Sequence, residues 1–542
     1  MRPPRRLGLW RWSPSLRRQQ PFINDRQGCW RCSPPIDSQP LINNRPNSQS
    51  NSLPLHRDRI DGYSVARLRP KLVIAIVVSR ADSASEHIGE HLLDVGDWKR
   101  RDDPSRPDAD GGGTYYRTDG FELREFDDLH IDLEDPAAAF GGDEDDAEGD
   151  DSPEFLAFVS RHSGETEELL TAHVTGNFGP APYGGEPETL ARAAPGAEKR
   201  VVEALAEHAP EGYDVGIECT HHGPTDTSVP SLFVELGSDE PQWADPEAAR
   251  AVARAVLDLR GTGADLTDEE NESDDPNFHP RHVVGFGGGH YAPRFTRIVR
   301  ETEWAVGHIG ADWALGEMGA RDENRDVIEQ AFARSRADLA VIEGDKPDLA
   351  ATVEGLGHRV VSETWVREVG DRPLPLVERL EAEVATVDEG LRFGEVVPAS
   401  PDAIRVRALP DELLSRAQGV AADATRAAVE ANAVAFDTEQ AGTRATGRAA
   451  FAADEVSPGY DDLVADLAGV LEQGYDAVEV DDDAVIAHET AFDPGLAAER
   501  GVPEGPAFGR LADGEAVEVD GETVAPEDVS RARTERFPII RF

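Results

Sequence analysis

The sequence has few cysteines, few basic residues and no long apolar run. Its 542 residues include three cysteines, Cys29, Cys32 and Cys219, which cannot build a disulfide framework and suit a reducing compartment. The longest apolar run, Leu72 to Val78, has the length of a strand, whereas a membrane-spanning helix needs roughly 18 apolar residues. We therefore expect no disulfide scaffold and no membrane partner, in a chain long enough for two or three domains.

Acidic residues outnumber basic ones, with 106 Asp and Glu against 54 Lys and Arg and a formal net charge of −52. The acids run through most of the sequence instead of forming one block, which argues against a disordered acidic tail. A distributed excess predicts a folded protein that holds water and cations at molar salt, and hence a high-salt cytoplasm. Any contact with nucleic acid then needs local basic groups and strong screening.

The first 72 residues differ in composition from the rest, with 13 Arg, one Lys, four Asp and no Glu. An arginine-rich leader and a small zinc or redox module at Cys29-Trp-Arg-Cys32 are two interpretations. The leader lacks an amphipathic pattern, and the CxxC pair lacks a second pair of ligands. We therefore expect residues 1–72 to be a disordered extension, or one absent from a native chain that starts near Val73.

Alternating strand and helix patterns over residues 73–395 predict an α/β domain with a mixed or parallel sheet and flanking helices. Short runs of β-branched and apolar residues predict strands at Val73–Val78, Phe155–Ser160, Leu169–Val174, Asp214–Cys219, Ser231–Leu236 and His282–Phe286. Helical spacing predicts helices that end near Leu93 and that cover Pro195–His208, Pro246–Leu259 and Ile328–Ala340.

Acidic segments interrupt this pattern near residues 95–153 and 262–279. We expect residues 95–120 to form a surface insertion and residues 127–151 to form a solvated loop. From residue 400 to 542 the texture changes to an α+β extension of unknown role. Here the sequence predicts one long helix over Leu413–Ala435 and a strand-like segment over Tyr475–Ile486.

The densest polar run after a predicted strand is Glu218-Cys-Thr-His-His-Gly-Pro224. Imidazole titrates near neutral pH and binds metals, so His221 and His222 suit acid–base chemistry or metal ligation. Adjacent residues of an extended chain point in different directions, so one histidine at a time faces a given pocket. A pair of structural loop histidines is the alternative interpretation.

A glycine-rich run, Gly285-Phe-Gly-Gly-Gly-His-Tyr-Ala-Pro293, follows another predicted strand. Its glycines allow close approach of a ligand to the backbone and offer amides to an anion. The run is not a dinucleotide fingerprint, because the last glycine of that pattern falls on His290, and it lacks the Gly-Lys-Ser/Thr of a P-loop. The alternative is a strained connector.

Further polar residues follow other strands, in Ser79–Ser85, Ser160–Ser163 and Leu170–Phe178. Structural roles compete with functional ones here, since His173 suits a buried hydrogen bond, Asn177 a turn and Asp82 a helix N-cap. However, histidines recur at the ends of strands, at His162, His173, His221, His222, His290 and His308. This concentration predicts a hydrolase, or a metal-dependent hydrolase, with a histidine-rich pocket.

Six motifs occur in an order that resembles the archaeal and plant D-aminoacyl-tRNA deacylase family. They are Ser79-Arg-Ala-Asp-Ser-Ala-Ser, Ser160-Arg-His-Ser, His173-Val-Thr-Gly-Asn-Phe, Glu218-Cys-Thr-His-His-Gly-Pro, Phe233-Val-Glu-Leu-Gly-Ser and Gly287-Gly-Gly-His-Tyr-Ala-Pro. The resemblance covers residues 73–395, with Cys219 in place of an expected Ala and a weaker match at Glu343–Lys346. It implies a monomer that hydrolyses the ester of D-aminoacyl-tRNA, or of glycine mischarged on alanine tRNA, at the 3′ acceptor end. It also implies zinc and a fold akin to peptidyl-tRNA hydrolase and nucleoside phosphorylases.

The motifs and the resemblance together nominate site residues. We predict catalytic roles for Glu218, His173, His221 and His222, with Glu218, His221 and His222 as metal ligands. We predict substrate binding by Asp82, Arg161, His162, Asn177, Thr220, Gly287, Gly288, Gly289, His290 and Tyr291. Backbone amides near Gly287–Gly289 would stabilise an oxyanion or hold a terminal phosphate.

Two other functions fit the same residues, a metal-dependent peptidase or phosphorylase-like enzyme and a charged-tRNA-binding protein without catalysis. In the C-terminal extension, residues 501–514 resemble a stretch of tRNA 3′-end-processing nucleases of the metallo-β-lactamase class. The metal-binding His-x-His-x-Asp-His of those nucleases is missing from the sequence, so their activity is not expected.

Overall fold

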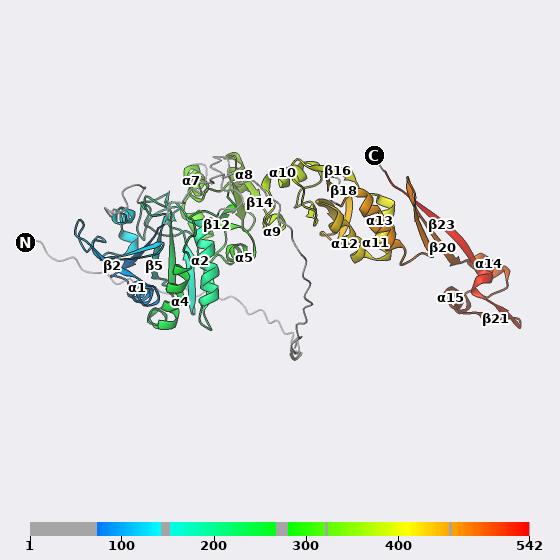
Figure 1. Cartoon of the computed structure of the whole chain (residues 1–542), viewed down its shortest axis with the longest axis horizontal. Coiled ribbons are helices and arrows are strands. Elements are labelled where there is room, and N and C mark those ends of the chain that lie inside the picture. The colour runs from blue at the N-terminus through cyan, green and yellow to red at the C-terminus, as the bar shows by residue number, and fades with distance from the viewer. Residues whose placement is uncertain (1–72, 142–151, 267–279, 320–323, 455–457, 541–542) are drawn as a thin grey trace, which may run out of the picture. The chain divides into compact units, whose positions relative to one another are not determined.

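The computed structural model describes residues 73–141, 152–266, 280–319, 324–454 and 458–540 (Figure 1). The expectations for residues 1–72, including the Cys29–Cys32 module, lie outside the described residues. The acidic segments 142–151 and 267–279 also lie outside the described residues. Within the described part, no helix is long and apolar enough to cross a membrane.

An eight-stranded mixed sheet forms the first part of the fold, in the order β2-β3-β4-β1-β5-β10-β6-β9. Its strands are β1 (Ile74–Ser79), β2 (Lys99–Asp103), β3 (Gly113–Thr118), β4 (Phe121–Phe126), β5 (Phe155–Arg161), β6 (Leu169–His173), β9 (Asp214–Ile217) and β10 (Ser231–Gly237). Strand β1 runs parallel to β4 and β5, β5 parallel to β10, and β6 antiparallel to β10 but parallel to β9. The predicted mixed α/β sheet with flanking helices is confirmed.

Both faces of this sheet are covered, because its central strands carry apolar side chains on both sides. Ile74, Ile76 and Val78 of β1 belong to a core shared with α1 (Ser83–Val95), α2 (Pro195–His208) and α4 (Pro246–Leu257). Ala75 and Val77 pack on the opposite face with Phe126, Phe140 and the 3-10 helix η2 (Pro136–Ala139). Shorter elements beside this sheet are η1 (His130–Asp132), β7 (Gly176–Asn177), β8 (Thr189–Leu190) and α3 (Glu240–Trp243).

A second, four-stranded parallel sheet follows, in the order β12-β11-β13-β14. Its strands are β11 (His282–Phe286), β12 (Ala305–Gly310), β13 (Leu339–Ile342) and β14 (Arg359–Val361). The helices around it are α5 (Pro293–Glu301), α6 (Asp312–Glu317), α7 (Arg325–Ser335), α8 (Pro347–Gly355), α9 (Glu363–Val369) and α10 (Leu374–Glu383). The predicted helix Ile328–Ala340 is wrong at its end, because Arg336 takes a left-handed φ of 48° and β13 begins at Leu339.

The C-terminal part combines helices with antiparallel sheets. Strands β15 (Arg392–Phe393), β16 (Ile404–Ala408), β17 (Ala435–Glu439) and β18 (Arg444–Ala452) pack against α11 (Asp411–Val420), α12 (Ala422–Asn432) and α13 (Tyr460–Leu471). Beyond them lie β19 (Ala477–Val480), β20 (Ala484–Phe492), α14 (Pro494–Glu499), α15 (Pro506–Ala512), β21 (Val517–Val519), β22 (Glu522–Val524), η3 (Pro526–Val529) and β23 (Ser530–Pro538). The boundary near residue 400 stays a prediction, and β15 pairs with β17 across it.

Two predictions for this C-terminal part are corrected. The helix predicted over Leu413–Ala435 is two helices, because Ala421 leaves the helical region with φ −150° and ψ 94°. Its last residue belongs to β17, whose side chains enter the core. The predicted strand Tyr475–Ile486 covers a hairpin of β19 and β20, in which Ala477 pairs with His488 and Val480 pairs with Val485. Runs of alanine fit helix and buried strand equally well, so their pattern did not separate the two.

The segment 95–120, where we expected a surface insertion, supplies β2 and β3 to one edge of the main sheet, and β2 is largely exposed. Charged residues in the neighbouring β4 hide the strand pattern. The Arg124 side chain is buried, with Nε 2.6 Å from Glu122 Oε1 and Nη1 2.8 Å from Asp103 Oδ2. Glu122 is also buried and contacts Arg117. Paired burial of opposite charges therefore replaces the apolar alternation that a half-buried strand normally shows.

Close packing around β12 generates a stability prediction. A Cβ added to Gly307 would collide with the Cβ and Oγ of Ser335 on α7, whereas one added to Gly469 of α13 meets nothing within 4 Å. We expect Gly307→Ala to lower the free energy of unfolding by about 1–3 kcal/mol through overpacking. The matched control Gly469→Ala should raise it by about 0.5–1 kcal/mol through helix propensity. Denaturant unfolding in molar KCl measures both, and equal effects would contradict this packing.

Candidate active site

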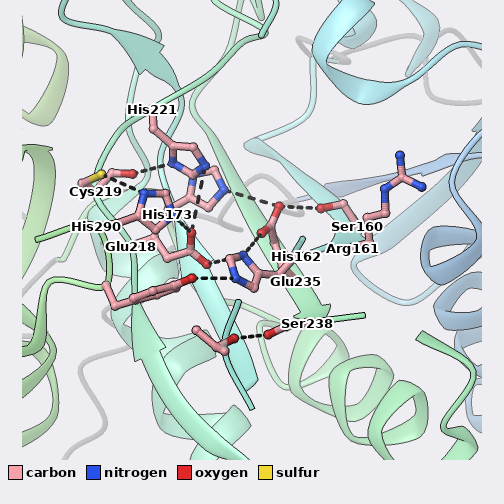
Figure 2. A network of polar contacts seen from close by, with 12 residues as sticks. Ser160, Arg161, His162, His173, Glu218, Cys219, His221, Glu235, Ser238 and His290 are labelled. Carbon is pink, nitrogen blue, oxygen red and sulfur yellow. Dashed lines mark hydrogen bonds and ion pairs between the residues drawn. The ribbon is translucent and has the colours of Figure 1, made fainter. Parts of the chain in front are cut away.

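Side chains from five segments converge near the ends of β5, β6, β9, β10 and β11 (Figure 2). In the first sheet β6 and β9 run opposite to β5 and β10, so the site does not lie at one carboxyl edge. His173 of β6 pairs with Phe233, two residues before Glu235 of β10. The loop after β9 is bonded to the second sheet, since Cys219 N donates to His290 O at 2.8 Å and Thr220 N to Ile309 O at 3.0 Å. The site therefore lies where the loops of both sheets meet. We call its polar group, made of His162, His173, Glu218, His221, His222, Glu235 and His290, the His/Glu cluster.

Two buried carboxylates organise the His/Glu cluster. Glu218 Oε1 lies 3.0 Å from His162 Nδ1, and Glu218 Oε2 lies 2.7 Å from His290 Nε2. Glu235 Oε2 lies 3.5 Å from His162 Nδ1, and its Oε1 lies 3.5 Å from His173 Nε2. Glu235 Oε1 also accepts a hydrogen bond from Ser160 Oγ at 2.7 Å. Both glutamates are almost completely inaccessible to solvent, so their charges need nearby cations.

Three imidazoles in this cluster are oriented by backbone carbonyls. The Nδ1 atoms of His221 and His222 lie 2.7 Å from Cys219 O and 2.6 Å from Gly223 O, and His173 Nδ1 lies 3.2 Å from Val174 O. A carbonyl accepts only from N–H, so each Nδ1 carries a proton. A neutral His221 or His222 then has its Nε2 lone pair available, whereas His173 Nε2 faces Glu235 Oε1 at 3.5 Å. Carbonyls that orient histidines in this way are common behind metal ligands.

Burial and neighbouring charges separate the protonation states of these histidines. Burial lowers the pKa of His222 to about 4, aided by His173, and holds the pKa of His221 well below its usual value. For His173, burial opposes protonation but the Glu235 carboxylate outweighs it and raises the pKa. Against a large burial effect, the histidines around Glu218 hold its pKa well below the usual range. Ionised glutamates thus face neutral and protonated imidazoles in one pocket.

His162 is the most basic histidine of the cluster. Burial alone would lower its pKa, but the carboxylates of Glu218 and Glu235 raise it to about 10. Its Nε2 lies 3.3 Å from the hydroxyl oxygen of Tyr291. A protonated His162 donates to this oxygen, which directs the hydroxyl proton of Tyr291 away from the imidazole. Burial, with the charge of Glu218, raises the pKa of Tyr291 and keeps its hydroxyl protonated at neutral pH.

The other predicted site residues lie around the His/Glu cluster and support its loops. Asp82 caps α1 through Ala84 N and Ser85 N, and its Oδ2 accepts from Arg161 N at 3.0 Å. Asn177 Nδ2 donates to Gly184 O at 3.0 Å and to Glu186 O at 3.2 Å. These contacts use the side-chain groups that were predicted to bind substrate.

Thr220 and His308 form a buried bond between the two sheets. Thr220 Oγ1 accepts from Ile309 N at 3.1 Å and lies 3.1 Å from His308 Nδ1, while His308 Nε2 lies 2.9 Å from Ala191 O. His308 Nε2 must therefore donate to the carbonyl, which leaves Nδ1 to accept from the Thr220 hydroxyl. Both side chains are fully used in holding the loop that carries His221.

Arg161 lies at the edge of the cluster, and its side chain points away from the glutamates (Figure 2). Its guanidinium carbon lies 5.4 Å from the ring centre of Trp243, whose indole nitrogen donates to His162 O at 2.9 Å. It has no carboxylate partner among the described residues, so it stays available for an anion.

The glycine loop after β11 is shaped by close contacts. Gly287 and Gly288 have φ of 95° and 78°. A Cβ on Gly287 would collide with the backbone oxygen of Glu343, and a Cβ on Gly288 would collide with the Glu343 carboxylate. The amide of Gly287 already donates to Gly310 O at 2.8 Å. Gly289 has open space where a Cβ would be. The loop therefore needs glycine at positions 287 and 288 for its conformation. Among the backbone amides predicted to bind an anion, the amide of Gly287 is already used in a hydrogen bond.

Glu235 and Ser160 both stand in recognised motifs, but neither was nominated as a site residue from the sequence. Glu235 lies within Ser231-Leu-Phe-Val-Glu-Leu-Gly237, a strand that is buried along its whole length. A charged residue in such a strand is rare unless it is paired, and this was the available signal. Ser160 stood in a recognised motif, yet its bond to Glu235 could not be foreseen.

Three groups of residues place possible metal ligands within 4.8 Å of one another: His173, His221 and His222; Cys219, His221 and His290; and His162, Glu218 and Glu235. The first group fits a metal best, because all three of its Nε2 atoms are free of backbone bonds. The second needs a thiolate, but burial and Glu218 raise the pKa of Cys219 to about 12. The third is already occupied by the proton on His162.

Comparisons with known proteins identify similar sequences. A family model described as D-aminoacyl-tRNA deacylase matches residues 150–361. A D-aminoacyl-tRNA deacylase of Halorubrum lacusprofundi is 84% identical over 479 residues, covering 86% of this chain and 97% of the relative. One of Haloarcula marismortui is 52% identical over 474 residues, covering 86% of this chain and 100% of the relative. A crystal structure of a conserved protein of unknown function is 29% identical, with a TM-score of 0.44, and covers 55% of this chain and 97% of that chain.

The buried His308 generates a prediction about acid stability. Burial lowers the pKa of His308 to about 4, so between pH 6.5 and 4 the unfolded chain binds a proton that the folded protein does not. The folded state should therefore lose up to about 3 kcal/mol from this group as the pH falls through that window. His308→Gln should be less stable at pH 8 but lose less stability between pH 6.5 and 4. Parallel stability curves of the two proteins, from denaturant unfolding, would contradict the assignment.

Proposed function

Because the chain belongs to the D-aminoacyl-tRNA deacylase family, we propose that it hydrolyses the ester between a D-amino acid and the 3′-terminal ribose of tRNA. The observation that carries this proposal is the His/Glu cluster, which places free imidazole nitrogens, two carboxylates and a protonated His162–Tyr291 pair in one pocket. Water adds to the ester carbonyl carbon and the bond to the ribose oxygen breaks. The products are a free D-amino acid and tRNA.

We assign a zinc ion to His173, His221 and His222, with Glu218 as the nearby carboxylate, 4.0 Å from His221 Nε2. Zinc, when bound, would lower the pKa of a coordinated water toward neutrality. The chain supports this assignment through the carbonyls on Nδ1 and the low pKa of His222. A group with a pKa of about 4 is a weak base at neutral pH, but its nitrogen is unprotonated, as a ligand must be.

We assign protonation of the leaving ribose oxygen to Tyr291 and His162. The phenol hydrogen of Tyr291 faces away from His162, and His162 Nε2, 3.3 Å from the phenol oxygen, can replace the proton that Tyr291 donates to a substrate oxygen. Glu218 and Glu235 stabilise the positive charge of His162 before the step. General acid catalysis of this type contributes about 10²–10⁴-fold to the rate.

We also propose a second substrate, an oligomeric state and a compartment for this protein. Glycine mischarged on alanine tRNA is a second substrate, since a site that excludes an L side chain accepts glycine. The protein acts as a monomer in a high-salt cytoplasm, with the 3′ acceptor end of charged tRNA as its partner. We further propose that its main sheet is related to those of peptidyl-tRNA hydrolase and nucleoside phosphorylases.

Deacylation of D-Tyr-tRNA against L-Tyr-tRNA in molar KCl tests the proposed function. We expect rapid release of tRNA from the D form alone. Binding of charged tRNA with both esters left intact would instead indicate a binding protein. Cleavage of aminoacyl peptides or phosphorolysis of nucleosides, without deacylation, would indicate the peptidase or phosphorylase-like alternative.

The acid role of His162 predicts a selective loss of rate. His162→Gln keeps a polar side chain but removes the transferable proton, so kcat for D-Tyr-tRNA should fall by about 10²-fold or more. His488→Gln, the same change on the distant β20, should leave kcat unaltered. Circular dichroism establishes that both variants fold. A His162→Gln variant with near-normal kcat would remove this residue from the chemistry.

The ligand assignment predicts how metal content responds to substitution. His222→Ala removes a ligand and should bind far less zinc and lose deacylation, whereas Cys219→Ala should keep its zinc because the thiol stays protonated. Chelator should inactivate the wild-type protein, and added zinc should restore it. Mass spectrometry of the metal content provides the measurement. Loss of zinc in Cys219→Ala would transfer the site to Cys219, His221 and His290.

A further inference from the structure

Aromatic side chains are unusually exposed around the His/Glu cluster. Only 6% of the chain is aromatic, and most of the aromatic side chains of the described residues are buried. Among the described residues, the large apolar side chains with strong exposure are three aliphatic ones, Val397, Val480 and Ile540, and three aromatic ones. The aromatic ones are Tyr183, Tyr291 and Trp313, which are 64%, 36% and 42% exposed. Exposed aromatic groups that gather at one place indicate a binding surface.

Each of these three residues is tied to a neighbour in the site. The Tyr291 hydroxyl contacts His162 Nε2 at 3.3 Å. Trp313, in the first turn of α6, follows Asp312, whose backbone N donates to Gly288 O at 3.0 Å in the loop that carries His290. Tyr183 O accepts from Gly223 N at 3.2 Å, directly after His222. Three separate segments thus bring one exposed ring each to the border of the same pocket.

The loop that carries Tyr183 is held in place by the protein. Asn177 donates to Gly184 O and Glu186 O, and Glu186 N donates to Thr225 Oγ1 at 2.9 Å. Gly179 packs so closely against the backbone at Glu317 that a Cβ there would lie about 3.0 Å from it. This contact brings the loop to the end of α6, the helix of Trp313. The exposed position of Tyr183 is therefore built into the fold.

Charge decides which part of a nucleic acid these rings suit. A protein of net charge −52 gains little from phosphates, and at about 1 M salt the screening length is near 3 Å. Contacts between phosphates and basic groups weaken steeply as salt rises. Stacking of a base on an aromatic ring involves no net charge, and it contributes about 1–3 kcal/mol per base. Stacking is thus the contact that still works under the conditions implied by this composition.

We propose that Tyr183, Tyr291 and Trp313 form a stacking rim for the unpaired bases at the 3′ end of tRNA. The rim rests on the proposed function and deepens it, because it names how the substrate is held. Unpaired nucleotides have the open faces that such rings need, whereas paired ones do not. The bases stack on the rings while the terminal ribose ester reaches the His/Glu cluster, and the free guanidinium of Arg161 is available to a backbone phosphate.

The test measures KM and kcat for D-Tyr-tRNA in molar KCl with Trp313→Ala and Tyr183→Ala. Neither residue belongs to the catalytic machinery, so KM should rise about 5- to 100-fold in each variant while kcat changes little. Trp313→Phe should restore most of the affinity, because a ring is retained. Val480→Ala, at an equally exposed side chain of β19, is the matched control and should not change KM.

Direct binding separates this inference from the proposed function. The trinucleotide CCA should bind wild-type protein with an affinity that changes little between 1 and about 3 M KCl, and bind Trp313→Ala and Tyr183→Ala weakly. Such binding supports the rim even if the wild-type protein does not deacylate D-Tyr-tRNA. Unchanged KM and CCA affinity in both variants would overturn the rim. An effect confined to D-Tyr-tRNA and absent with D-Ala-tRNA would also overturn it, since the rings would then contact the amino acid.

Discussion

The negative charges of two buried carboxylates must be balanced by nearby histidines, and this requirement sets the protonation states in the rest of the site. Glu218 and Glu235 both approach His162 Nδ1, and neither has access to solvent. Removing a charge from water is costly, and removing a partner from a buried pair leaves that cost uncompensated. The glutamates therefore hold a proton on His162, and Glu235 raises the pKa of His173, so a metal bound at His173 would displace a proton that Glu235 favours. The surplus positive charge in turn keeps His221 and His222 neutral, as metal ligation requires.

This arrangement depends on both sheets at once. The loop after β9 carries Glu218 and the adjacent histidines, and it is bonded through its backbone to His290 and Ile309 of the second sheet. The Thr220–His308 contact adds a buried side-chain bond to the same connection. A shift of one sheet against the other would separate Glu218 from His290 or from His162. The pocket is therefore rigid where its charges are most closely balanced.

The sequence predicts elements well where one interaction dominates the pattern. Strands such as β11 and helices such as α2 follow from apolar spacing, and the histidine runs locate the pocket. Prediction fails where charges replace apolar residues or where alanine fits two structures, as in β4 with Glu122 and Arg124 and in β17. Glu235 escapes for the same reason, because its carboxylate lies within an apolar strand and its partners come from β5 and β6. Such pairings depend on tertiary contacts that a local pattern does not contain.

Burial also explains how one protein can be strongly acidic and still maintain a finely balanced site. Salt screens exposed charges over a few ångströms at molar concentration, whereas buried pairs are screened much less. A change in salt concentration therefore alters the interactions of the surface acids, while the buried His162–Glu218 contact at 3.0 Å stays strong. Recognition of a polyanion faces the opposite constraint, because it happens at the surface where salt acts. Exposed rings beside a buried charge cluster satisfy both constraints, since stacking tolerates salt and the chemistry is shielded from it.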